Sequence, residues 1–204
     1  MNSEQLKQQR ILLSLLLLYY VVYLMCAILL QLRSGESPSQ PGTVFDIFSG
    51  SILWMLSISS ILIATLRFNS KPKFLLWLAI SAVAGALAID EIFEFHEKTT
   101  RIVGDDDYFK IISWLIAGIG SYILYAVERP TKKIALVFVT GYLFHTLYLV
   151  VDMGDGDFFS LPFSMAVLIW AEEILETLAL QGYLAGFLLH YTLIAESTNR
   201  LPKL

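Results

Sequence analysis

The stretch from Phe74 to Phe95 reads FLLWLAISAVAGALAIDEIFEF, and its pattern recurs along the chain. Its first sixteen residues carry no charge, whereas its last six include the carboxylates of Asp90, Glu91 and Glu94. An α-helix needs about 20 predominantly apolar residues to cross a bilayer core of about 30 Å. The stretch therefore predicts a membrane-spanning helix that carries acidic side chains near one end.

Similar apolar stretches account for almost the whole chain of 204 residues, of which 56% are hydrophobic. The mean hydropathy of +0.66 lies well above that of a soluble domain. Short charged or Pro/Gly-bearing connections separate the stretches and leave no room for a soluble domain. We expect an all-α, polytopic transmembrane bundle of about six helices forming a single domain, residues 1–204, with spans near 11–32, 45–66, 74–95, 109–127, 134–151 and 163–195.

The first apolar stretch resembles a signal peptide only in its basic flank, Lys7 and Arg10. Its apolar run of about 22 residues exceeds the apolar region of a signal peptide, and residues 31–34 offer no small-x-small cleavage site. We therefore expect a retained first helix. The net charge of −4 argues against a nucleic-acid partner, and the single cysteine, Cys26, can form no intrachain disulfide.

The distribution of basic residues predicts the orientation, because cytoplasmic loops of membrane proteins are enriched in Lys and Arg. With the N-terminus in the cytoplasm, ten of the 14 basic residues fall on the cytoplasmic side. This orientation also puts the C-terminus in the cytoplasm and 15 of the 18 acidic residues in outer loops or outer halves of helices. Such an acidic surface concentrates cations, whereas the basic cytoplasmic loops need no further function.

Acidic side chains form a stripe at the end of the third predicted span. At about 100° per residue, Asp90, Glu94 and Glu97 share one helix face, with Glu91 at its edge and His96 roughly opposite. A stripe of this kind inside a membrane indicates a function, since charged side chains are rare there.

A second set of ionisable residues lies in the fifth and sixth spans. In the last span Glu172 and Glu176 are one turn apart, and Glu173 stands three residues before Glu176. The fifth span carries His145 near its middle and Asp152 two turns later on nearly the same face. The predicted topology puts all of these groups in the outer half of the bilayer.

These carboxylates need neutralisation, because one ionised residue at a helix centre costs about 2.5–3.5 kcal/mol on insertion scales. No Lys or Arg lies within the third, fifth or sixth span, which leaves protons, His145, His96 or a bound metal ion. Carboxylates with imidazole suit Mn²⁺, Fe²⁺ or Zn²⁺, whereas oxygen ligands alone suit Ca²⁺ or Mg²⁺. We predict a divalent metal site drawn from Asp90, Glu91, Glu94, His96, Glu97, His145, Asp152, Glu172, Glu173 and Glu176.

Two short motifs carry a family resemblance. The motif Asp90-Glu91…His96-Glu97 closes one span, and Glu172-Glu173-x-x-Glu176 opens the last. Together with their general spacing, these motifs resemble a family of uncharacterised bacterial multi-pass membrane proteins. The resemblance implies a bacterial inner-membrane location and a shared site, and it implies no activity.

Other patterns indicate packing rather than chemistry. Gly182-x-x-x-Gly186 predicts close helix contact, either within the chain or between protomers of a homo-oligomer. Trp77, Trp114 and Trp170 fall near predicted membrane interfaces, where an aromatic belt accounts for them.

Three classes of function remain open from the sequence, and the clustering of the acidic groups at one depth favours the metal site over pure transport. The metal site could serve a membrane enzyme, in which the metal activates water or oxygen, a glutamate is the general base and His145 is a ligand. The same carboxylates could instead serve a transporter linked to protons or divalent cations. A structural subunit would pair its carboxylates with a basic helix of a partner. The lipid bilayer is the one partner that all three share.

Overall fold

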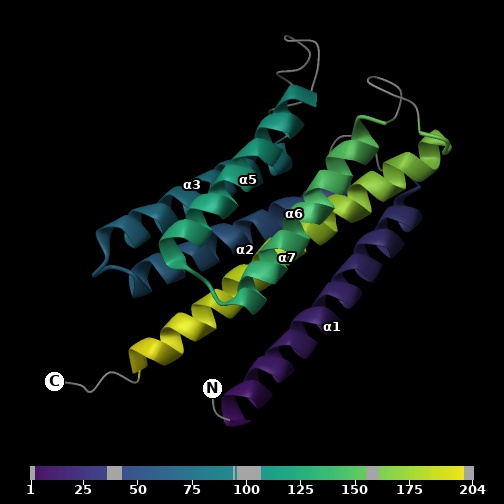
Figure 1. The fold of residues 1–204 in the computed structure, drawn as a ribbon. Coiled ribbons are helices and arrows are strands. Elements are labelled where there is room, and N and C mark those ends of the chain that lie inside the picture. Colours follow the sequence, from purple (N-terminus) through teal and green to yellow (C-terminus); the bar gives the residue numbers. More distant parts are fainter. Residues whose placement is uncertain (1–2, 36–42, 94, 96–106, 155–160, 200–204) are drawn as a thin grey trace.

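The computed structural model describes residues 3–35, 43–93, 95, 107–154 and 161–199 (Figure 1). All regular secondary structure in these ranges is α-helical, which confirms the predicted fold class. The six helices are α1 (Ser3–Ser34), α2 (Val44–Leu66), α3 (Lys71–Phe93), α5 (Asp107–Glu128), α6 (Lys132–Asp152) and α7 (Met165–Asn199).

Five of the six helices are long and apolar enough to cross a membrane, namely those from α2 to α7. In the described part of α1 the apolar segment, Leu18–Ser34, is shorter than in these five helices. Large apolar side chains lie exposed along the outside of the bundle, among them Leu29, Ile58, Ile119 and Leu136. Such an apolar exterior is what lipid tails require, and it supports a multi-pass membrane protein.

Two antiparallel helix pairs form the centre of the bundle. Helix α2 packs along α3 and helix α6 along α7, and α2 also contacts α7 and so joins the pairs (Figure 1). Helix α5 lies against α3 and α6, whereas α1 lies across α2 and α7. Successive helices alternate in direction, so α1 begins and α7 ends at the same end of the bundle (Figure 1). The cytoplasmic location of that end stays a prediction.

Small residues allow the helices of both pairs to approach closely. Between α2 and α3, the Ser57 hydroxyl donates to the carbonyl oxygen of Ser81 at 3.0 Å. Between α6 and α7, a Cβ on Gly182 would lie 2.7 Å from the Cα of Gly141, and one on Gly186 would lie 2.6 Å from the Phe138 ring. The Gly182/Gly186 face is therefore packed within the chain, and its role in a homo-oligomer stays a prediction.

Replacing Gly182 with Ala should lower stability, because the new methyl group would force the α6 and α7 backbones apart. We expect a loss of about 1–3 kcal/mol, as for other overpacked sites. Gly120→Ala is the matched control, since nothing lies within 4 Å of a Cβ at that position and Ala favours helix. Thermal unfolding in detergent, followed by circular dichroism, should separate the two variants. Equal melting temperatures would contradict this packing.

Candidate functional site

The side chain of Lys110, in the first turn of α5, joins two carboxylates from other helices. Its Nζ lies 2.5 Å from Oδ1 of Asp152 on α6 and 3.0 Å from Oε1 of Glu172 on α7. The same ammonium stands 5.9 Å from the centre of the Tyr148 ring, within the range of a cation–π contact. Only 19% of the Lys110 side chain and 9% of the Asp152 side chain are exposed. The ammonium group is therefore enclosed by two carboxylates and an aromatic ring.

Further carboxylates surround this ion pair. Glu176 interacts electrostatically with Asp46 of α2, with Lys110 and with Asp152. Glu91 of α3 interacts with Glu176, Asp46 and Lys110. We call this set the acidic cluster; it comprises Asp46, Glu91, Lys110, Tyr148, Asp152, Glu172, Glu173 and Glu176. Within the described residues, this cluster combines six carboxyl groups with one lysine and one tyrosine.

Helix termini bring these groups together. Asp46 stands at the third position of α2, where its Oδ2 accepts a 2.7 Å hydrogen bond from the backbone N–H of Thr43. This arrangement is one half of a capping box, which fixes the start of the helix. Lys110 lies near the start of α5, and Asp152 is the last residue of α6. Because the helices alternate in direction, these termini meet at one end of the bundle.

The structure brings together half of the residues predicted for the site and adds others. Glu91, Asp152, Glu172, Glu173 and Glu176 all belong to the acidic cluster. Asp90 adjoins it through its electrostatic interaction with Glu91. Glu94, His96 and Glu97 lie outside the described residues.

His145 has a different environment from the carboxylates. Its ring centre lies 5.9 Å from that of Tyr148 and 6.3 Å from that of Tyr183, which is on α7. Its Nδ1 is buried and has no hydrogen-bond partner among the described residues. His145 therefore lies beside two tyrosine rings, and its role as a ligand stays a prediction.

Three members of the acidic cluster, Asp46, Lys110 and Tyr148, were not predicted from the sequence. Lys110 lies in the fourth predicted span and Asp46 in the second, whereas the predicted site residues come from the third, fifth and sixth. Tyr148 carried no signal beyond its place one turn before Asp152. Asp46 was detectable, because Thr43 and Asp46 have the spacing of a capping box at the same predicted membrane face.

In this conformation, no three His, Cys, Asp or Glu side chains within the described ranges form a set that could hold a metal ion.

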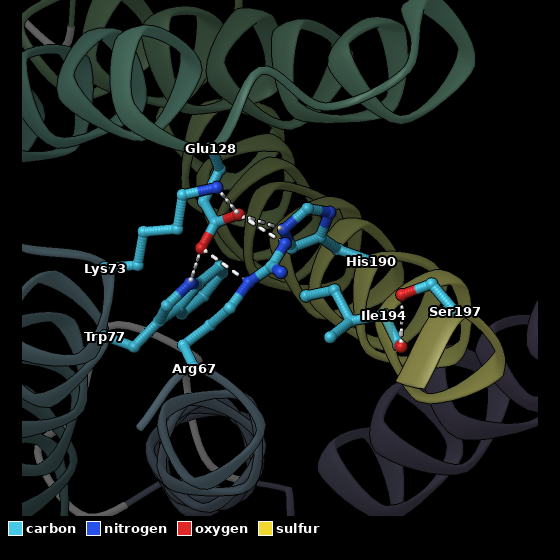
Figure 2. Close-up of polar contacts among 7 residues, drawn as sticks. All are labelled: Arg67, Lys73, Trp77, Glu128, His190, Ile194 and Ser197. Carbon is cyan, nitrogen blue, oxygen red and sulfur yellow. Dashed lines mark hydrogen bonds and ion pairs between the residues drawn. The ribbon is translucent and has the colours of Figure 1, made fainter. Parts of the chain in front are cut away.

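A second ionisable group lies at the opposite end of the bundle and centres on Glu128, the last residue of α5 (Figure 2). Arg67 contacts both carboxylate oxygens, with Nε 3.1 Å from Oε1 and Nη2 2.7 Å from Oε2. Trp77 donates its indole N–H to Oε1 at 2.9 Å, and the Lys73 ammonium lies 3.5 Å from Oε2. The Glu128 side chain has 0% exposure. We call these residues, with His190, the Glu128 cluster.

His190 completes this group from α7 (Figure 2). Its Nε2 lies 3.4 Å from Oε2 of Glu128, and its ring stacks on Trp77 at 5.6 Å between centres and an interplanar angle of 27°. Trp77 is fully buried, so the aromatic-belt interpretation is wrong for this tryptophan. The basic residues at this end have a structural role in addition to any effect on membrane orientation, because Arg67 and Lys73 neutralise the buried carboxylate of Glu128.

The backbone after Glu128 helps to hold its side chain in the bundle. Arg129 has φ 50°, in the left-handed region, and its N–H donates to the carbonyl oxygen of Tyr125 at 3.0 Å. Pro130 follows and cannot continue the helix. Helix α5 therefore ends at Glu128. The carboxylate stands at this helix end, where it contacts Trp77 of α3 and His190 of α7.

An aromatic layer separates the two clusters. Phe187 of α7 packs against Trp77 at 5.1 Å and against Phe138 of α6 at 5.6 Å, measured between ring centres. Both phenylalanines are buried. Between this layer and the acidic cluster lie buried polar atoms that have no hydrogen-bond partner within the described residues, on Thr177, Gln181 and Tyr183. The bundle thus has a polar interior on one side of an apolar barrier.

The fold and these clusters define a multi-pass helical membrane protein with ionisable groups buried at both ends of its bundle. Residues 42–191 match the family described as a domain of unknown function, DUF8692, and the chain belongs to that family. Both clusters lie within the matched residues, whereas α1 lies outside them. Comparison with curated proteins found no match, and comparison with solved structures found none.

Proposed function

We propose that this chain is a cation-binding membrane protein and that the acidic cluster is its binding site. One observation carries the proposal. Asp152 shares the Lys110 ammonium with Glu172, yet its second oxygen, Oδ2, is buried without a hydrogen-bond partner among the described residues. A buried carboxylate oxygen of this kind costs free energy unless a positive charge or a proton satisfies it.

Lys110 acts in this proposal as an internal cation that an external one replaces. Its ammonium stands on a flexible four-carbon stem near the end of the bundle, where it can turn toward water. Its departure would expose Asp152 and Glu172 to an incoming cation, and Glu176 lies near enough to Asp152 to interact with it electrostatically. Replacement of the ammonium by a divalent ion would add one positive charge to the cluster, which its carboxylates would offset.

We propose transport rather than catalysis as the role of this site, with the following support. Thr177, Gln181 and Tyr183 lie deeper along α7 than the acidic cluster and have buried polar atoms without a described partner. Such atoms are costly in hydrocarbon, and water reaching them from the cluster would satisfy them. The Phe138–Phe187 layer and the Glu128 cluster would close the other end. In this proposal, the cation enters at the acidic cluster, and transport would require a second conformation that opens the other end, as alternating access does.

The predicted divalent metal ion is one candidate for the cation. Carboxylates without imidazole suit Ca²⁺ or Mg²⁺, and Mn²⁺ also accepts oxygen ligands. Binding would require Asp152, Glu172 and Glu176 to approach one another after Lys110 leaves. We also propose a bacterial inner-membrane location, with the acidic cluster facing outward, on the strength of the motif resemblance and the distribution of basic residues.

Elemental analysis of the detergent-purified protein tests the metal proposal. Wild type, supplied with Ca²⁺, Mg²⁺ and Mn²⁺ in turn and then desalted, should retain about one metal ion per chain. The double variant Glu172→Gln, Glu176→Gln should lose it, because an amide oxygen binds divalent cations far more weakly than a carboxylate.

Glu196→Gln is the matched control, since this glutamate lies at the other end of α7. It should retain as much metal as wild type. If all three proteins carry equal metal, or if none carries any, a divalent cation is not the ligand of the acidic cluster.

A further inference from the structure

Two short connections between helices meet at the Glu128 cluster. Residues 67–70 join α2 to α3, and residues 129–131 join α5 to α6. Glu128, directly before the second connection, pairs with Arg67 in the first connection and with Lys73 just after it (Figure 2). These ion pairs therefore hold the two connections together at one end of the bundle.

Positive charge at these connections exceeds what Glu128 neutralises. Residues 67–73 and 128–133 contain six basic residues and one acidic residue, an excess of five positive charges. Neither α3 nor α6 has an acidic residue in its first turn. We call the six the basic surface; four are exposed, Lys71, Arg129, Lys132 and Lys133, and two are partly exposed, Arg67 and Lys73.

Exposed apolar side chains adjoin the basic surface. Phe68, in the first connection, is 72% exposed, and its ring packs edge to face on Phe74 at 5.5 Å between centres. Leu62, Leu75 and Leu136 are also exposed, each about one helical turn from a helix end at the connections. This end of the bundle thus combines a positively charged rim with an apolar outer wall.

An anionic phospholipid matches both features. Its head group has the charge that the rim lacks, and basic residues next to membrane-spanning helices bind such head groups. Its acyl chains would cover Phe68 and the neighbouring leucines, which a soluble phosphate would leave exposed. An acidic protein segment would satisfy the charge but offers no acyl chain to the apolar wall.

We propose that the basic surface binds the head group of an anionic phospholipid, whose acyl chains lie along Phe68, Leu75 and Leu136. The acidic cluster lies at the opposite end of the bundle, so this proposal does not depend on the proposed cation site. Bound lipid would bridge the α2–α3 and α5–α6 connections and add to the ion pairs of Glu128.

Thermal unfolding in a neutral detergent tests the proposal on wild type. Phosphatidylglycerol, which is anionic, and phosphatidylcholine, which is zwitterionic, are added separately at the same mole fraction. We expect phosphatidylglycerol to raise the melting temperature by about 3 °C more than phosphatidylcholine does. NaCl at about 1 M should remove most of this difference, because it shortens the Debye length to about 3 Å.

Two matched variants locate the effect. The triple variant Lys71→Gln, Lys132→Gln, Lys133→Gln should lose most of the preference for phosphatidylglycerol. The triple variant Lys71→Arg, Lys132→Arg, Lys133→Arg keeps the charge and should keep the preference. Without added lipid, both should melt with wild type, because the ion pairs of Glu128 are intact in each.

Further additions distinguish the lipid from other anions. Glycerol phosphate has the charge without acyl chains, and polyglutamate is an acidic chain, so neither should stabilise wild type as phosphatidylglycerol does. An equal effect of either one, or of phosphatidylcholine, would overturn the proposal. So would a full preference for phosphatidylglycerol in the glutamine variant. If that variant does not fold, the lipid, salt and soluble-anion measurements on wild type still decide the question.

Discussion

Replacing Glu128 with Gln is expected to lower the free energy of unfolding by about 3 kcal/mol, because breaking a buried ion pair leaves its partner charges uncompensated. Glu128 is the common acceptor of Arg67, Lys73 and Trp77 from two other segments of the chain. This loss is at the lower end of the range for buried ion pairs, because the side chains of Arg67 and Lys73 are 24% and 29% exposed. Unfolding in mixed micelles, followed by circular dichroism, measures the change.

A paired variant distinguishes lost charge balance from lost packing. Adding Arg67→Met to Glu128→Gln removes the opposite charge as well, and we expect it to recover at least half of the lost stability. Glu196→Gln serves as the control, with a loss of at most about 1 kcal/mol, since the electrostatic interactions of a partly exposed carboxylate contribute little. A Glu128→Gln loss no larger than that of the control would contradict the role assigned to the Glu128 cluster.

Replacing Lys110 with Met should also destabilise the protein, and the loss should depend on pH. Without the ammonium, the Asp152 and Glu172 carboxylates repel each other in a partly buried site, at a cost of about 3 kcal/mol when both are ionised. The folded variant then binds more protons than the unfolded chain, so its stability falls as pH rises. We expect a clearly lower melting temperature at about pH 8 than at about pH 5.

Lys132→Met is the control for this experiment, because Lys132 is an exposed lysine at the opposite end of the bundle. Its melting temperature should follow that of wild type at both pH values. A Lys110→Met loss that is the same at both pH values would mean that the lysine matters for packing alone. No loss at either value would mean that the ion pairs with Asp152 and Glu172 contribute nothing.

The helices were predictable from the sequence because hydrophobic length is a strong and local signal. The span predicted from Phe74 to Phe95 overlaps α3 almost completely, and the last span overlaps α7. The contacts between helices were less predictable, since small residues indicate close packing without naming the partner. Gly182 signalled a close approach, but only the structure identifies Gly141 as the residue it meets.

Part of the candidate site was also predictable, because charged residues within an apolar stretch are a local signal. Carboxylates inside an apolar run are conspicuous, so Glu91, Asp152 and Glu176 could be chosen from the sequence. Lys110 and Glu128 stand near helix ends, where charged residues are common and carry no special signal. Their roles depend on which helix ends meet in space, and that information lies in the packing of α5 against α3 and α6.

Calorimetric titration of wild type with Ca²⁺, Mg²⁺ and Mn²⁺ in turn tests the central claim most directly. The claim is that Lys110 holds a place in the acidic cluster that an external cation can take. We predict saturable heat with about one site per chain for at least one of these cations, and its loss in Asp152→Asn combined with Glu172→Gln. No saturable heat in wild type, or the same heat in the double variant, would contradict it.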